Sequence, residues 1–262
     1  MKDAQRRFVF NSYAELYDRA RPAYPAKMFA DLQTAGVIGP ESNVLEIGAG
    51  SGQVTRDLAP LVGSVTALEP GERLATLARQ RLGDFPRVVI VTSTLEDFAQ
   101  SDQLFDAIVA GTSFHWVDPE VRFSRCAALL HPRGAIAVFW NLWDDQTRAP
   151  FSQFADLYTD LAPSLGTHRM PSGGTREPEG EPGRELFGQW EHRDYRWELS
   201  YPAAAFTDML ATHSAYRMIP SGERQSLLEA VERRIDAELG GTIVVPYVTV
   251  LRFARLMDAT VR

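Results

Sequence analysis

The chain contains a single cysteine, Cys126, among 262 residues. One thiol cannot form an internal disulfide, and it cannot supply a cysteine cluster for a metal. Phe123, Ala127 and Leu130 lie near it at helical spacing, so we expect Cys126 on a buried helix face, without a catalytic role. The five histidines, at positions 115, 131, 168, 192 and 213, also lack the short spacing of ligands. No metal is therefore predicted.

Long apolar runs are missing as well. No segment approaches the ~18 apolar residues that a membrane-spanning helix needs, and residues 1–7 lack the apolar core of a signal peptide. The composition, 45% hydrophobic and 23% charged, is typical of a globular protein and allows one large domain over residues 1–262. We expect a cytoplasmic protein with no membrane partner.

Positive charge is scarce. The chain has 27 lysines and arginines against 34 acidic residues, a net charge of −7, and no basic run. This balance opposes attraction to phosphate backbones, so no nucleic-acid partner is predicted. A small-molecule partner is favoured, and the oligomeric state is left open.

The most informative stretch covers residues 43–52, with the sequence NVLEIGAGSG. Its apolar run predicts a buried strand, and its three alternating glycines predict a turn that a ligand can approach closely. Val54, Leu58 and Leu61 follow at helical spacing, so the turn leads into a helix whose first N–H groups favour an anion. A dinucleotide-binding fingerprint would need its third glycine at position 53, where this chain has Gln53.

An acid ends the next predicted strand, over residues 65–69. Glu69 stands 17 residues after Gly52. A carboxylate at this point of a doubly wound sheet can accept hydrogen bonds from both hydroxyls of a ribose. Both NAD and S-adenosylmethionine (SAM) contain that ribose, and the alternative for Glu69 is a solvated strand end.

Two further strand ends carry candidate site residues. The strand over 88–91 precedes Thr94, Leu95 and Glu96, although Glu96 could instead be an acid at a helix start. The strand over 105–110 precedes His115 and Trp116. Open α/β sheets bind ligands at carboxyl strand ends, so His115 and Trp116 are expected at the site.

The pattern Glu46-x-Gly48-x-Gly50-x-Gly52 resembles the first motif of the class I SAM-dependent methyltransferases. The leader FNSYAELYDRARPAYP over residues 10–25 resembles small-molecule methyltransferases, including the trans-aconitate type. The segment after the third strand and the Pro132-x-Gly134 turn are also similar to the family. The resemblance covers roughly residues 8–140 and rests on no lid motif.

The resemblance implies SAM as cofactor, with S-adenosylhomocysteine as product. The methionine end would lie over the glycine turn, the ribose on Glu69 and the adenine near Leu95 and Glu96. The implied cofactor contacts are Tyr17, Arg21, Glu46, Gly48, Ala49, Gly50, Gly52, Glu69, Pro70, Thr94, Leu95, Glu96, Ala110, His115 and Trp116. The candidate acceptor contacts are Tyr13, Trp116, Trp140 and Arg217.

Strands alternating with helices predict a parallel, doubly wound α/β sheet. The resemblance implies a Rossmann-like sheet of seven strands in the order 3-2-1-4-5-7-6, with the last strand, over 242–253, antiparallel. Helices are predicted over 150–162, 203–211 and 223–239. We expect residues 1–25 to form a lid helix and residues 202–240 a helical insertion over the site.

Methyl transfer from a sulfonium requires alignment and exclusion of water more than dedicated catalytic groups. A base helps only when the acceptor must lose a proton, and His115 is the candidate; a cofactor contact or a structural imidazole are its alternatives. Arg21, Arg169 and Arg217 could pair with an acidic acceptor. The predicted acceptor group is a carboxylate or a hydroxyl. An NAD-dependent oxidoreductase and a non-enzymatic SAM-binding protein are the rival functions.

Overall fold

The computed structural model describes residues 16, 19–99, 104–144, 152–165 and 180–258. A seven-stranded sheet forms its centre, in the order β3-β2-β1-β4-β5-β7-β6. This is the predicted order, and β7 is antiparallel to both of its neighbours, as predicted. In the described ranges, none of the helices is long and apolar enough to cross a bilayer.

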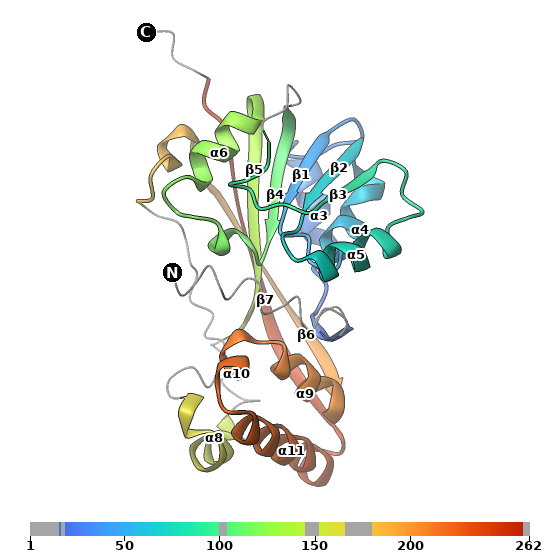
Figure 1. The fold of residues 1–262 in the computed structure, drawn as a ribbon, viewed down its shortest axis with the longest axis vertical. Helices are drawn as coiled ribbons and strands as arrows, with labels where there is room; N and C mark the ends of the chain where they lie inside the picture. Colours follow the sequence, from blue (N-terminus) through green and yellow to red (C-terminus); the bar gives the residue numbers. More distant parts are fainter. Residues whose placement is uncertain (1–15, 17–18, 100–103, 145–151, 166–179, 259–262) are drawn as a thin grey trace.

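The first half of the chain forms the parallel part of the sheet (Figure 1). Its strands match the predicted ones closely because each is a short apolar run bounded by glycine, proline or acidic residues. The elements are α3 (Ala26–Thr34), β1 (Asn43–Ile47), α4 (Gln53–Leu58), η2 (Ala59–Leu61), β2 (Ser64–Leu68), α5 (Glu72–Arg81), β3 (Val88–Val91), β4 (Phe105–Gly111), η3 (Phe114–Trp116) and α6 (Arg122–Leu129).

Both faces of this parallel part are buried, so alternate residues of one strand enter different cores. Val44 packs in the core with α3 and α4, whereas its neighbour Leu45 packs in the core with α6. Cys126 lies in the second core with no exposure, as predicted, and burial raises the pKa of its thiol. A buried, protonated thiol is a poor nucleophile.

The sequence predicts a fifth strand over 135–140, after the Pro132-x-Gly134 turn, but β5 (Leu130–Trp143) begins before that turn. Phe105 pairs with Leu130, but Ala107 already pairs with Ala135, so residues of β5 bulge out of register. Arg133, inside this bulge, has a φ of 65°. The Pro132-x-Gly134 turn is therefore part of the strand as a bulge and does not precede it.

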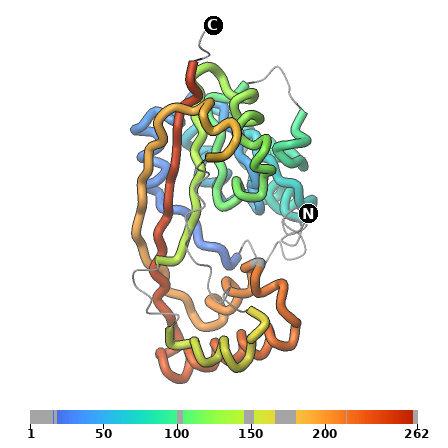
Figure 2. Tube along the Cα trace, turned by 90° about the vertical axis from the view of Figure 1, so that its left-hand side faces the viewer, coloured from blue at the N-terminus to red at the C-terminus, as the bar shows by residue number. Residues whose placement is uncertain are grey.

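Three long strands carry a separate group of helices at one end of the sheet, as Figures 1 and 2 show. β5, β6 (Glu191–Pro202) and β7 (Thr242–Arg255) run beyond the shorter parallel strands. At their far end lie α8 (Ala155–Leu161), α9 (Ala203–Ala211), α10 (Ser214–Met218) and α11 (Ser221–Glu238), which we call the helical cap. α9 and α11 agree with the prediction, whereas α10 was not predicted.

The helical cap has its own core. Phe154 and Phe206 stack with ring centroids 6.2 Å apart, and both are fully buried. Leu227, Val231 and Ile235 present one face of α11 to the same core, at the helical spacing seen in the sequence. The predicted insertion over residues 202–240 is thus completed by α8, from before β6.

An acid is buried in the centre of the sheet. Glu46, on β1, is 1% exposed, and Oγ1 of Thr55 on α4 donates a hydrogen bond to its Oε2 at 2.6 Å. Burial raises the pKa of Glu46 to about 7, the Thr55 hydrogen bond opposes the rise, and the nearby Glu69 and Asp57 add to it. The carboxyl group therefore takes up a proton more readily in the folded chain than in the unfolded chain.

This burial predicts a stability that depends on pH. Because the folded pKa of Glu46 lies near 7 and its unfolded value near 4.5, the protonated form favours folding. The free energy of unfolding should lose at most ~3 kcal/mol as the pH rises from about 4.5 to 7, and then level off. Urea unfolding between pH 5 and 8 should show a steeper slope in the wild type than in Glu46→Gln, in which only Glu69 keeps a pKa that burial raises. Parallel pH profiles for the two proteins would contradict the assignment.

Candidate cofactor and acceptor site

The turn after β1 accepts only glycine at its first position. Gly48 has a φ of +72°, and a Cβ added to it would lie 2.5 Å from the Cβ of Ser113. The N–H groups of Gly48 and Ala49 both donate to the carbonyl oxygen of Leu68, at 2.8 and 2.9 Å. The turn therefore joins the ends of β1 and β2 and is closely covered by the loop after β4. The predicted helix follows it in two parts, α4 and η2.

Glu69, directly after β2, organises this turn. It is 5% exposed, and its two carboxylate oxygens accept hydrogen bonds from the N–H groups of Gly50 and Gly71, each at 2.8 Å. Burial raises the pKa of Glu69, and these two hydrogen bonds oppose the rise. The solvated alternative for Glu69 is wrong. Since a carboxylate has about four acceptor positions, both oxygens keep the capacity to accept a ribose hydroxyl.

The segment after β3 stabilises its own turn and the next loop. The hydroxyl of Thr94 donates to Asp97 at 2.9 Å, and Leu95 is buried at 1% exposure. Oε1 of Glu96 accepts a hydrogen bond from the N–H of Asp118 at 3.1 Å. The candidate adenine segment thus contacts the loop that carries His115.

The loop after β4 brings two separate parts of the site together. Its Thr112 has a φ of 53°, and the Thr112 hydroxyl lies 2.7 Å from the hydroxyl of Tyr24. The hydroxyl of Ser113 donates to the carbonyl oxygen of Ile47, beside the glycine turn. Neither Tyr24 nor Ser113 was among the predicted site residues.

His115 and Trp116 lie on η3 in this loop, both half-buried, with their rings 4.5 Å apart. The indole N–H of Trp140, on β5, points to Nδ1 of His115 at 3.4 Å. A nitrogen that accepts this hydrogen bond has its lone pair engaged, which favours a positioned imidazole over a general base. The predicted residues His115, Trp116 and Trp140 are therefore brought together.

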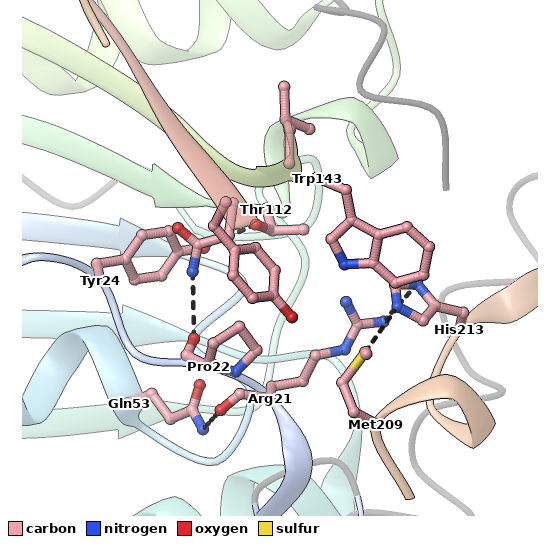
Figure 3. A pocket seen from close by; sticks show the side chains of 11 residues that line it. Arg21, Pro22, Tyr24, Gln53, Thr112, Trp143, Met209 and His213 are labelled. Carbon is pink, nitrogen blue, oxygen red and sulfur yellow. Dashed lines mark hydrogen bonds between the residues drawn. The ribbon is translucent and has the colours of Figure 1, made fainter. Parts of the chain in front are cut away.

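A cavity of about 80 Å³ opens between the sheet edge and the helical cap (Figure 3). It draws on the start of α4, the ends of β4 and β5, the middle of β7 and the cap. The residues that line it are Arg21, Pro22, Tyr24, Gln53, Thr112, Asn141, Leu142, Trp143, Met209, His213 and Tyr247. Aromatic rings and one cation dominate the wall, and no carboxylate lies among these lining residues.

The cation and the imidazole in this wall interact. Nη2 of Arg21 lies 3.4 Å from Nδ1 of His213 and 3.3 Å from the carbonyl oxygen of Thr212. Burial, and then the positive charge of Arg21, hold the pKa of His213 well below its usual range. A neutral His213 accepts from Arg21 at Nδ1, so Nε2 carries the proton and faces the sulfur of Met209 at 3.3 Å.

Residues 19–24, which we call the bridging segment, connect the sheet with the helical cap. Arg19 forms an ion pair with Asp208 on α9 at 2.8 Å. On the other side, the amide of Gln53 donates to the carbonyl oxygen of Arg21 at 3.2 Å. The amide of Asn141 donates to the carbonyl oxygens of residues 22 and 23, each at 3.2 Å. The bridging segment therefore touches the glycine-turn helix, β5 and the helical cap at once.

Other predicted residues are either not described or lie away from the cavity wall. Tyr13, Tyr17 and Arg169 lie outside the described residues. Arg217 lies on α10 and is not among the residues that line the cavity. Ala110 is fully buried within β4.

Other residues at the site were missed by the sequence analysis. The strand-end rule that found His115 would also have found Asn141 and Trp143, at the end of β5. No local signal marks Met209 or His213, because only the packing of α9 against the long strands brings them to the cavity. Among the described residues, no group of three or more histidine, cysteine or acidic side chains could hold a metal.

The sequence of the central region matches a known family. Residues 45–138 match the family model described as a methyltransferase domain. These residues contain the glycine turn, Glu69, the segment after β3 and the loop that carries His115.

Individual proteins are similar over a longer range. An uncharacterized methyltransferase of Mycobacterium tuberculosis is 26% identical over 246 residues, which cover 92% of this chain and 93% of that protein. A malonyl-[acyl-carrier protein] O-methyltransferase of Anoxybacillus flavithermus is 27% identical over 62% of this chain and 59% of its own length. The trans-aconitate type, suggested by the leader, stays a prediction.

The fold also occurs in a solved structure from Anaeromyxobacter dehalogenans, described as a candidate type II methyltransferase. It has a TM-score of 0.62 and 22% identity, with 91% of this chain and 99% of that chain covered. This chain therefore has the seven-stranded fold of this methyltransferase structure, and its residues 45–138 match the methyltransferase domain model.

Proposed function

We propose that the protein binds SAM beside the glycine turn and transfers its methyl group to a small molecule held in the cavity. The observation that carries this proposal is the arrangement of the turn. The carboxylate of Glu69 fixes the turn by accepting hydrogen bonds from its backbone. The hydrogen bond between the hydroxyls of Tyr24 and Thr112 links the loop after β4 to the cavity wall. A cofactor on the turn and an acceptor in the cavity would thus lie at the same edge of the sheet, where open α/β sheets bind ligands.

The expected cofactor contacts are distributed over three strand ends. The glycines of residues 48–52 would let the methionine end approach the backbone, whose N–H groups would hold it. The carboxylate of Glu69 would accept hydrogen bonds from the ribose hydroxyls. Leu95 and Glu96 would contact the adenine. SAM supplies an electrophilic methyl group on its sulfonium, so the protein has mainly to align it with the acceptor and keep water out.

The helical cap and the bridging segment are proposed to exclude that water. Arg19 and Arg21 contact the cap, while Gln53 and Asn141 hold the backbone of the same segment against the sheet. A segment held from both sides can close the gap between the sheet and the helical cap to water. This arrangement supports the expectation that residues 1–25 and 202–240 close over the site.

The proposed acceptor is a small metabolite, and an acid is favoured. Arg21 places a guanidinium in a wall whose lining residues include no carboxylate, which suits an anion better than an amine. An O-methyltransferase acting on a malonyl group is among the relatives, which agrees with methylation at oxygen. A carboxylate acceptor is already ionised, so it would not need His115 as a base.

The first test is cofactor binding by calorimetry. The wild type should bind SAM and S-adenosylhomocysteine but not NAD. Gly48→Ala should weaken binding more than tenfold, because the added Cβ would collide with Ser113 and distort the turn. Gly222→Ala is the matched control, since a Cβ at Gly222 meets no atom within 4 Å, and it should bind as the wild type does. Tight NAD binding without any response to SAM would refute the cofactor assignment.

A second test separates the two roles of Glu69. Glu69→Gln should weaken S-adenosylhomocysteine binding by ~1–3 kcal/mol, because one charge-assisted acceptor is removed. To isolate the ribose contact, binding of a 2′,3′-dideoxy analogue is measured with both proteins. The wild type should lose affinity for the analogue, and Glu69→Gln should lose much less. Equal losses in the two proteins would leave Glu69 as a support of the turn alone.

The acceptor is tested by a screen of small carboxylic acids, phenols, amines, a protein mixture and nucleic acids with labelled SAM. A carboxylic acid should be methylated, and Arg21→Met should reduce its turnover at low substrate concentration more than at saturation. For a carboxylate acceptor, His115→Ala should cost little; for a hydroxyl acceptor, loss of a general base should cost ~10²–10⁴-fold. Methylation of a polymer, with every small molecule inactive, would defeat the proposal.

A further inference from the structure

Arg122, on α6, supports the loop after β4 from inside the protein. Its side chain is 8% exposed, and its Nη1 donates a hydrogen bond to the carbonyl oxygen of Phe114 at 2.9 Å. Its guanidinium also lies over the ring of Phe114, 4.8 Å from the centroid. Within η3 the same carbonyl accepts the N–H of Val117 at 3.3 Å, so the hydrogen bond from Arg122 is the shorter of the two.

Glu181 completes this arrangement from a distant part of the chain. Both of its carboxylate oxygens accept hydrogen bonds from Arg122, one from Nε and the other from Nη2. Its side chain is 23% exposed, so the pair is mostly shielded from water. The two bonds to Glu181 fix the plane of the guanidinium and thereby aim its third group, Nη1, at Phe114.

A buried ion pair contributes little net stability compared with apolar residues of the same size. Phe114 and Phe123, whose rings lie 4.8 and 5.9 Å from the Arg122 guanidinium, are apolar and could pack with an apolar partner. The charged pair therefore supplies an orientation that apolar packing would not supply. What it orients is the backbone at residue 114, one residue before His115.

We propose that Arg122 and Glu181 are positioning residues for the cofactor. They fix the backbone of η3 and so hold His115 and Trp116 in the orientation that the cofactor meets. This inference rests on the proposed function, because it takes the loop after β4 as part of the cofactor site. Neither Arg122 nor Glu181 is expected to touch a ligand.

The other hydrogen bonds of the loop explain why this one matters. Thr112 is held by Tyr24 and Ser113 by Ile47, both before the loop reaches η3. His115 itself has a long hydrogen bond, 3.4 Å, with Trp140. The hydrogen bond from Arg122 adds a tie from α6 to the backbone of η3, between Ser113 at its start and His115.

The experiment measures binding of S-adenosylhomocysteine by calorimetry, together with quenching of tryptophan fluorescence, in Glu181→Gln and Arg122→Lys. Glu181→Gln removes the charge, and Arg122→Lys keeps the charge but cannot form the planar pair of hydrogen bonds. Both should raise the dissociation constant about tenfold, the effect expected when one hydrogen bond to the ligand is misaligned. Both should also change the fluorescence response, because Trp116 and Trp140 border the loop.

The control is Asp194→Asn, which alters another ion pair of a buried arginine. Arg252 and Asp194 lie 2.8 Å apart on β7 and β6, and the side chain of Arg252 is also 8% exposed. This variant should lose thermal stability like Glu181→Gln and bind S-adenosylhomocysteine as the wild type does. Glu181→Asp, a milder change, replaces Glu181→Gln if that variant does not fold, and it should show an intermediate dissociation constant.

The outcomes are distinct. If the wild type does not bind S-adenosylhomocysteine, the proposed function fails. If the wild type binds it and the folded Glu181 and Arg122 variants bind it as tightly as Asp194→Asn does, the positioning role is wrong and the pair is structural. A lower melting temperature alone, with unchanged binding and fluorescence response, leads to the same conclusion.

Discussion

The close approach of Gly48 and Ser113 is the constraint on which the rest of the site depends. With no side chain at Gly48, the loop after β4 can lie directly against the turn after β1, and the Ser113 hydroxyl reaches the carbonyl oxygen of Ile47. This approach fixes the distance between the two central strand ends. Glu69 on one side and the Tyr24 and Thr112 pair on the other side are then placed relative to the same two strands.

The sheet could be predicted from the sequence because its information is local. Each parallel strand is a short apolar run, and the glycine motif and the acid at Glu69 identify the central strands. The order of the last two strands came from the family resemblance and was correct. The bulge in β5 was missed because it depends on pairing between Phe105 and Leu130, which no local pattern shows.

The sequence predicts which residues lie together at the strand ends, but it does not predict which residues of the cap reach the cavity. Strand ends in a parallel sheet converge at one edge, so the glycine turn, Glu69 and His115 could be placed together from sequence alone. Met209 and His213 reach the cavity only through the packing of the cap. A helix pattern predicts which residues are buried, but it does not say which other element buries them. Glu96 illustrates the remaining difficulty, because its hydrogen bond to Asp118 follows neither from a helix start nor from an adenine contact.

The long strands have a consequence for how acceptor preference can change. β6 and β7 pair without interruption, from Glu191 and Phe253 at one end to Pro202 and Thr242 at the other. This two-stranded ribbon is therefore part of the sheet and also supports the helical cap. The cap is therefore anchored by this ribbon to the same sheet that carries the glycine turn. Variation in the cavity among related proteins should appear at Met209 on α9 and at His213 in the turn after it. Such substitutions would change the shape of the cavity wall and leave the glycine turn and Glu69 unaltered.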